Sequence, residues 1–196
     1  LSINLGFWIA YLTLFVHEGA HYNLSKNKKI NNYISNIFLG WFSGIEVNNY
    51  RSTHFEHHKF LGTTKDTEIT YIENLTPFFL FKLITGLYVI EVLFKKRKFI
   101  SNVNKISSRI YFYFSILIHL LILFFLYNFN FNCFFIWLIG TICFFPLFWG
   151  LRQLLEHRDE NSDPNKDYTI DDHGPVTRIF GDNVFSSFFG AAGFNK

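Results

Sequence analysis

Six of the eight histidines in this 196-residue sequence fall into patterns that suit a transition metal. Residues 17–21 read HEGAH, and residues 54–58 read HFEHH. On a helix, a spacing of four places His17 and His21 on one face, one turn apart, and positions 54, 57 and 58 also share a face. Imidazoles grouped in this way can bind one cation or two adjacent ones, so both strings predict metal sites.

The remaining histidines differ in their surroundings. His157 follows the last apolar segment by about one or two turns, at the same depth as the first pair. Gln153 lies four residues earlier on the same face, where its amide would hold a metal-bound water or orient a ligand. His119 lies within an apolar run and is expected to hydrogen-bond a neighbouring helix, and His173 is expected to be a loop residue.

The number of imidazoles predicts more than one metal ion. A catalytic zinc takes three protein ligands and an open position, so five or six convergent imidazoles imply two metals. Imidazole suits iron, copper, nickel and zinc, so ligand chemistry leaves the metal open. The expected ligands are His17, His21, His54, His57, His58 and His157.

The elements that position these residues are membrane segments. Hydrophobic residues make up 49% of the chain, and there are 27 Phe, a composition unusual for a soluble domain. Residues 110–129 and 133–151 carry no formal charge and are long enough to cross about 30 Å of hydrocarbon. A tight hairpin at 130–132 joins them, and residues 1–16 are read as the remainder of a third span of a chain missing its start.

Two weaker segments are assigned elsewhere. The apolar segment 34–45 has only a dozen residues, which favours a buried or re-entrant helix over a membrane-spanning one. Residues 77–94 contain Lys82 and Glu91, and a charge at the bilayer centre costs at least ~2.5 kcal/mol, so an interfacial helix is expected. Residues 158–196 are rich in polar residues and are expected to form a cytoplasmic tail that folds back toward the membrane as a cap.

Charge distribution predicts the sidedness. The histidine strings lie on one side of the membrane only if an even number of spans separates them, and the two firm spans satisfy this. Lys and Arg, apart from Lys82, then lie on the histidine side, which the positive-inside rule makes cytoplasmic. The net charge of +3 is explained by this rule, so no nucleic-acid partner is expected. Asn- and Lys-rich usage suggests an AT-rich genome and a bacterial inner membrane.

These observations predict one all-α domain over residues 1–196. It is an integral membrane helical bundle with interfacial helices and a cytoplasmic cap carrying the histidine strings. Cys133 and Cys143 lie within an apolar segment without CxxC spacing, so neither a disulfide nor a metal role is expected.

The histidine strings resemble those of the membrane fatty acid desaturase superfamily. Its members carry an HxxxH box, then an HxxHH box, and a third HxxHH box near the C-terminus. Residues 17–21 are similar to the first box at the end of a span, and residues 54–58 to the second. Arg51 before the second box, with Asp66 and Glu68 after it, also fits. The resemblance covers nearly the whole sequence.

The resemblance implies a di-iron centre that activates O2 and removes hydrogens from two adjacent carbons of an acyl chain, leaving a double bond and water. It also implies an electron donor of the ferredoxin or cytochrome b5 type, docking on the cytoplasmic face. Further acceptors for imidazole N–H groups are expected to be Glu18, Glu56 and Glu156.

The sequence around His157 resembles a family segment in which a histidine after the last span joins the iron ligands. Relatives carry an Asn four residues earlier, where Gln153 stands here. No third box is present among the 196 residues, and 189–195 resembles the sequence that leads into it. The chain is therefore expected to stop short of that box and, as written, to be inactive.

Three alternatives stay open. The same boxes occur in membrane hydroxylases of lipids, alkanes or carotenoids. HEGAH also matches the HExxH motif of zinc proteases, with Glu18 as general base, but the spans lack the Asp that an intramembrane protease needs as third ligand. A metal or proton transporter would place ionisable groups near the midplane, where only His119 lies.

Overall fold

The fold is that of a computed structural model, which describes residues 1–61, 65–68, 70, 73–96 and 105–157. The described part is helical and contains no strand, which confirms the all-α prediction for these residues. Its elements are α1 (Ser2–Ala20), α2 (Lys28–Ile34), the π-helical turn η1 (Ser35–Gly40), α3 (Trp41–Ser43), α4 (Val47–Phe60), α5 (Pro77–Ile84), α6 (Leu87–Lys96), α7 (Lys105–Phe129), α8 (Phe131–Ile139), the π-helical turn η3 (Gly140–Phe144) and α9 (Phe145–His157).

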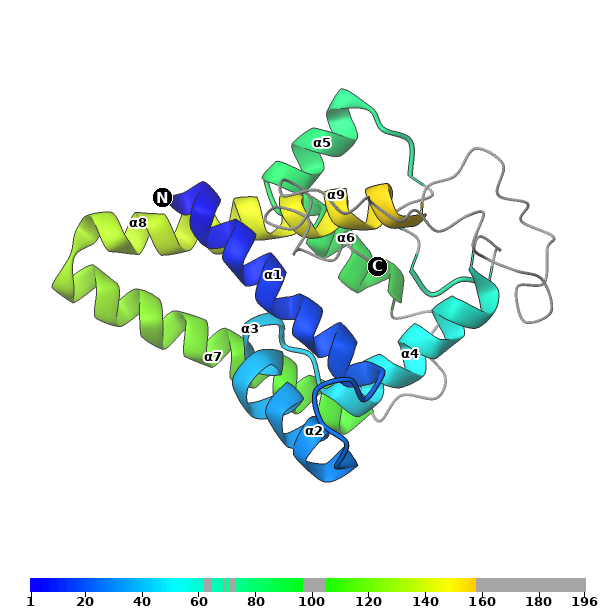
Figure 1. The fold of residues 1–196 in the computed structure, drawn as a ribbon. Coiled ribbons are helices and arrows are strands. Elements are labelled where there is room, and N and C mark those ends of the chain that lie inside the picture. Colours follow the sequence, from blue (N-terminus) through cyan, green and yellow to red (C-terminus); the bar gives the residue numbers. More distant parts are fainter. Residues whose placement is uncertain (62–64, 69, 71–72, 97–104, 158–196) are drawn as a thin grey trace, which may run out of the picture.

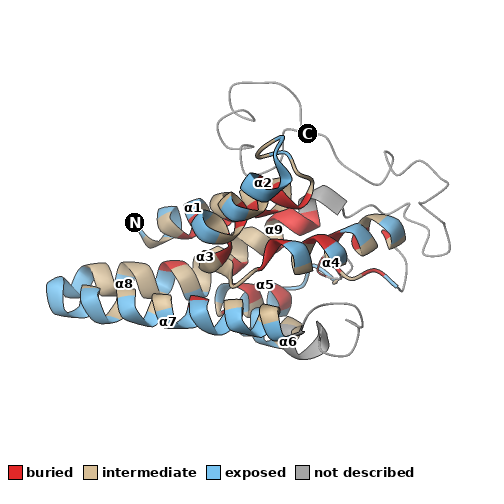
Figure 2. Ribbon diagram, turned by 90° about the horizontal axis from the view of Figure 1, so that it is seen from below, coloured by how far each residue is buried: buried red, intermediate tan, exposed pale blue. Residues whose placement is uncertain are grey.

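A long hairpin forms one side of the molecule (Figure 1). Its two arms, Ile106–Phe129 and Phe131–Leu154, each have 24 residues and are long and apolar enough to cross a membrane. The side chain of Asn130 caps the second arm, accepting hydrogen bonds from the backbone N–H groups of Asn132 and Cys133 at 3.0 and 3.2 Å. Exposed residues dominate α7, and α8 has exposed and intermediate residues but no buried one (Figure 2), as expected of helices whose outer faces meet lipid.

Helix α1 packs against η3 and α9 on one side and reaches α4 at its C-terminal end (Figure 1). Gly6 allows the close crossing, because a Cβ atom there would collide with the side chain of Phe144. Ile9 and Val16 are almost fully buried in the same helix. The helix continues past the apolar segment to Ala20, so the first histidine string starts on it.

The short segment expected at 34–45 folds as the tail of α2, η1 and α3. The π-helical turn runs directly into α3, which ends at Gly44 with φ +66°. Gly44 packs against α7, where a Cβ atom would lie 3.2 Å from the Cα atom of Phe112. The segment is therefore a broken helix held beside α7.

Where one interfacial helix was expected at 77–94, the structure has two, α5 and α6. The break is at Gly86, whose φ is +72° and whose missing side chain allows contact with η3: a Cβ atom would lie 2.7 Å from the carbonyl oxygen of Ile142. The turn brings Lys82 and Glu91 together, with Nζ 2.8 Å from Oε2. This pairing lowers the cost of keeping both charges in an apolar hairpin.

Candidate metal centre

The first histidine pair lies at the C-terminal end of α1. His17 is in the last turn, and His21 is the C-cap residue. Tyr22 follows with φ +62°, the left-handed conformation that commonly ends a helix, and the N–H of Asn23 then bonds the carbonyl of Glu18 at 2.9 Å. The helix therefore stops directly after the pair, with both imidazoles at its end.

The second histidine string lies on α4. Glu46 is the N-cap of this helix, and its carboxylate accepts hydrogen bonds from the N–H groups of Asn48 and Asn49 at 3.0 and 2.9 Å. Further along the helix, His54 and His57 are buried and His58 is half-buried. The cap sets where α4 begins, and thus the helical phase of its histidines.

Arg51 joins α4 to the end of α1. Its guanidinium donates to the carbonyls of Ala20 at 2.7 Å and Gly19 at 2.9 Å, and it lies 3.8 Å from the ring centroid of Tyr22. The last carbonyls of a helix have no partner within the helix, so a cation placed there supplies the missing donors. The buried arginine thus fixes the two histidine strings relative to each other.

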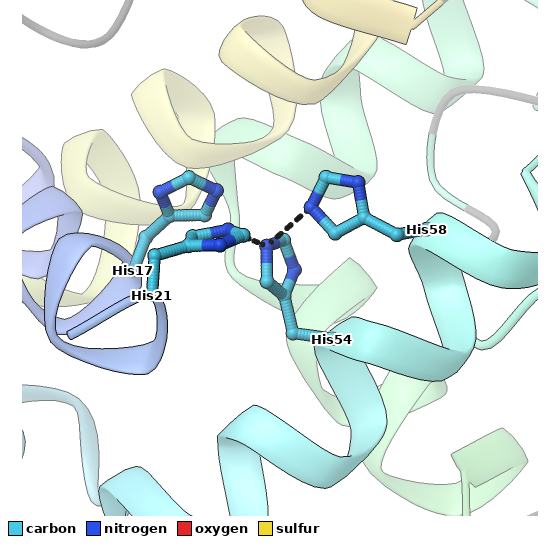
Figure 3. A group of neighbouring side chains, drawn as sticks. All are labelled: His17, His21, His54 and His58. Atoms are coloured by element: carbon cyan, nitrogen blue, oxygen red, sulfur yellow. Dashed lines mark hydrogen bonds between the residues drawn. The ribbon is translucent and has the colours of Figure 1, made fainter. Parts of the chain in front are cut away.

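Four imidazoles, those of His17, His21, His54 and His58, meet between these helices (Figure 3). One ring nitrogen from each lies within 4.8 Å of the others. Nε2 of His54 is central, at 3.0 Å from Nε2 of His21 and 2.9 Å from Nε2 of His58. Two imidazole nitrogens on one metal, at bonds of about 2.0–2.1 Å, lie about 2.9–3.4 Å apart for right-angled to tetrahedral arrangements. The cluster therefore fits a bound transition metal.

Burial keeps most of the cluster uncharged. Burial lowers the pKa of His54 to about 4 against the opposing effect of Glu68, and lowers the pKa of His58 to about 3 together with the neighbouring imidazoles. Burial also lowers the pKa of His21. A metal ligand must be a neutral imidazole, so these three side chains are in the required state near neutral pH.

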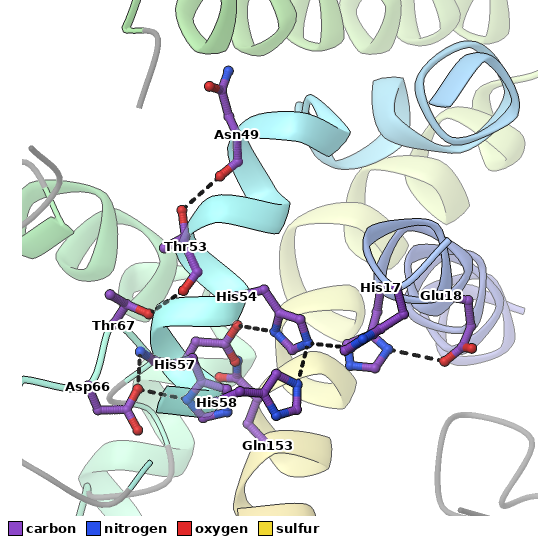
Figure 4. A network of polar contacts seen from close by, with 12 residues as sticks. His17, Glu18, Asn49, Thr53, His54, His57, His58, Asp66, Thr67 and Gln153 are labelled. Carbon is purple, nitrogen blue, oxygen red and sulfur yellow. Dashed lines mark hydrogen bonds and ion pairs between the residues drawn. The ribbon is translucent and has the colours of Figure 1, made fainter. Parts of the chain in front are cut away.

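Carboxylates orient the cluster from outside (Figure 4). Nδ1 of His17 donates to Glu18 at 3.2 Å, and this hydrogen bond, with a second one from Asn23, lowers the pKa of Glu18 to about 2. Nδ1 of His54 lies 3.5 Å from Glu68, whose other oxygen accepts a 2.8 Å hydrogen bond from Nε2 of Gln153. A carboxylate accepts only, so each places the imidazole proton on Nδ1 and leaves the Nε2 lone pair for a metal.

His57 lies beside the cluster but outside the group of four. Its Nδ1 donates to Asp66 at 2.7 Å, and both side chains are fully buried. The ring centroid of His57 is 5.8 Å from that of His54 and 5.7 Å from that of His58. The three imidazoles of α4 are thus neighbours, with two of them in the group of four.

A comparison with known protein families shows which family the chain belongs to. The model of the fatty acid desaturase family matches residues 1–194. The chain belongs to the fatty acid desaturase family. No curated protein and no solved structure matched the chain.

Several expectations for this desaturase-family chain concern residues that the structure does not describe. The side chains of Glu156 and His157 lie outside them, as do His173 and the tail at 158–196. Among the described residues, Glu56 makes no hydrogen bond to an imidazole, and Asp66 and Glu68 take the role expected of it.

A cavity of about 300 Å³ lies beside the histidine cluster of this desaturase-family chain, and Glu68, which contacts His54, is among its lining residues. One end is formed by Thr53, Glu68 and Gln153, beside the cluster, and its walls come mainly from α4, α6 and α9. Apolar side chains provide most of the lining, among them Val89, Val92, Phe145, Pro146 and Trp149. Periodicity of one sequence segment does not reveal such a cavity, because its walls come from distant segments.

Proposed function

We propose that this protein is an O2-dependent desaturase of lipid acyl chains with a di-iron centre. One observation carries the proposal: four imidazoles from α1 and α4 converge beside a largely apolar cavity, next to its lining residue Glu68, in a chain of the fatty acid desaturase family. The family supplies the reaction class, and the cluster and the cavity supply a place for it.

The proposed ligands are His17, His21, His54, His57, His58 and His157. Bound iron would supply the redox chemistry that activates O2. Glu18, Asp66 and Glu68 would hold the imidazoles in the tautomer with a free Nε2 lone pair. Each of these contacts prepares the ligands before the metal arrives.

Gln153 is proposed to act between the metal centre and the cavity. Its Nε2 atom is engaged by Glu68, and its buried Oε1 atom accepts no hydrogen bond from the described residues. The residue is 93% buried and lines the cavity. A buried amide oxygen of this kind can accept a hydrogen bond from a water at the metal centre or orient what enters the cavity.

The cavity is proposed to hold the acyl chain with its reacting carbons toward the histidines. Apolar side chains on α6 and α9 would offer a hydrocarbon chain the contacts that it needs. Glu68 and Gln153 line the cavity next to the cluster, and Ser43, Glu46, Asn49 and Ser108 add polar groups elsewhere in its lining. The reacting carbons would lie beside Glu68 and Gln153, and the apolar part of the chain along α6 and α9.

We propose that the protein is an integral membrane protein with its histidines on the cytoplasmic side; a bacterial inner membrane stays a prediction. Lys26, in the loop after α1, and Lys28 and Lys29, in the first turn of α2, are exposed a few residues after the first histidine pair. These cations would attract an acidic ferredoxin or cytochrome b5-type donor. Electrons would then enter near His17 and His21.

Product analysis tests the reaction. The complete gene is expressed in a host, and its lipids are compared by mass spectrometry with those of a His54→Ala variant. We expect acyl chains with one additional double bond, which the variant does not form. A hydroxylated product without a new double bond would show that the protein is a hydroxylase.

A further inference from the structure

His119 is a histidine outside the group of four, in the middle of α7, and both of its ring nitrogens are engaged. Nε2 lies 3.0 Å from the carbonyl oxygen of Phe42, and Nδ1 lies 3.2 Å from Nε1 of Trp137. The three residues come from α3, α7 and α8. The side chain therefore ties the broken helix at 35–43 to both arms of the hairpin.

The two partners fix the tautomer of His119. An indole N–H only donates, so Trp137 requires Nδ1 to be the acceptor. A carbonyl only accepts, so Phe42 requires Nε2 to carry the proton. Both ring nitrogens of the neutral imidazole are thus occupied by hydrogen bonds, which suits a position within an apolar arm. Neither nitrogen is left to bind a metal.

One face of α7 is devoted to holding α3 and the turn after it. Phe112, Ser115 and His119 are spaced three and four residues apart, so they lie on the same side of the helix. Phe112 and Ser115 contact the turn at Gly44, where a Cβ atom would lie 3.2 and 3.4 Å from their nearest atoms. One turn further along α7, His119 holds the carbonyl that precedes this turn.

The held turn lines the cavity just before the start of α4, and Ile45 lies eight residues before Thr53. Ser43, Gly44 and Ile45 line the cavity, as does Phe145 of α9. From Phe145 to Gln153 at the cluster end, α9 advances eight residues, about 12 Å at 1.5 Å per residue. The turn therefore lies where the far end of an acyl chain would stop.

We propose that His119 is a positioning residue that sets the depth of the acyl cavity, by holding α3 and the 43–45 turn against α7. This inference rests on the proposed function for the identity of the occupant, an extended acyl chain. Without the Nε2 donor, Phe42 loses its partner, and a longer chain displaces the turn at lower cost. Chain-length preference, rather than metal binding, is the property that His119 controls.

The test measures binding of labelled stearate and palmitate to the protein, purified from its complete gene in lipid nanodiscs. His119→Leu removes both hydrogen bonds, whereas His119→Gln keeps one donor and one acceptor. Leu121→Ala, at an exposed position on the same helix, is the matched control. We expect His119→Leu to raise the stearate-to-palmitate affinity ratio by about tenfold, because each pair of methylenes in a fitted apolar site changes binding by about that factor.

The outcomes separate this proposal from the proposed function. An unchanged ratio in His119→Leu, with iron content and product formation kept, overturns the role of His119 and leaves the desaturase assignment standing. A changed ratio in a protein that forms no unsaturated product supports the role of His119 and counts against the desaturase assignment. The control and His119→Gln should stay within about twofold of wild type.

A second variant decides the matter if His119→Leu does not fold. Trp137→Phe keeps a ring at the same place and removes only the indole N–H that selects the tautomer. The imidazole keeps its hydrogen bond to Phe42 but loses the donor that holds Nδ1 against α8, so we expect a smaller change of the ratio in the same direction. A Trp137→Phe protein with the wild-type ratio would overturn the proposal.

Discussion

Replacement of Arg51 should separate the two histidine strings. The guanidinium is nine-tenths buried and donates to two carbonyls at the end of α1 while stacking on Tyr22. It also donates to the side-chain oxygens of Asn32 and Asn48, each at 2.8 Å. Arg51→Leu leaves all four oxygens without this donor, and a leucine supplies no substitute.

The magnitude follows from these contacts. A hydrogen bond from a charged donor contributes about 1.5–3 kcal/mol, and a guanidinium over an aromatic ring about 0.5–2 kcal/mol. Because the contacts share one side chain, they do not add fully, and we expect the free energy of unfolding to fall by about 3–5 kcal/mol. Arg51→Lys keeps the charge but cannot span both carbonyls, so about half of the loss is expected.

The assay is thermal unfolding of the purified protein, together with its iron affinity. At about 2–4 °C per kcal/mol, Arg51→Leu should lower the midpoint by about 10 °C. Misplacement of supporting groups typically costs 10–100-fold in metal affinity, and we expect a loss of about that size. Lys28→Ala is the control: its Nζ lies 5.0 Å from the same Tyr22 ring but is exposed. Equal midpoints for Arg51→Leu and Lys28→Ala would refute the reasoning.

Three further predictions follow from single contacts. Gly19→Ala should lower the midpoint of thermal unfolding by several degrees, because the new Cβ collides with the hydroxyl of Ser35. The double variant Gly19→Ala with Ser35→Gly removes this collision and should regain most of the lost thermal stability. Glu68→Gln should weaken iron binding about 10–100-fold in a metal titration, since the carboxylate that orients an imidazole is lost; wild-type affinity would contradict its role. A double-mutant cycle on Lys82 and Glu91 should give a coupling of about 0.5–1 kcal/mol, because both side chains are partly exposed, and zero coupling would show that the pair contributes nothing.

The hairpin could be predicted from the sequence because its signal is local. A run of about twenty uncharged residues has few alternatives to a long apolar helix, and 110–129 and 133–151 lie within the two long apolar arms. The break at Gly86 could not be predicted, because it depends on the approach of the Ile142 carbonyl from η3. Long apolar runs carry their own signal, whereas helix breaks made by tertiary contacts do not.

The same distinction applies to the metal centre. Spacing alone indicated that His17 and His21 share a helix face, and that His54, His57 and His58 share another. That His54 and His58, without His57, form the group of four with the first pair depends on the fold, in which Arg51 holds α4 to the end of α1. Likewise, Asp66 and Glu68 follow α4 in the chain, but only the folded loop returns them to its imidazoles.

The metal content of the purified protein tests the central claim most directly. Protein from the complete gene is analysed by elemental mass spectrometry as wild type, His54→Ala and His119→Gln. His54 Nε2 lies within 3.0 Å of two other imidazole nitrogens, so its loss removes the middle of the cluster. We expect iron in the wild type and in His119→Gln, and little in His54→Ala. Full iron content in His54→Ala, or zinc without iron in the wild type, would contradict the account.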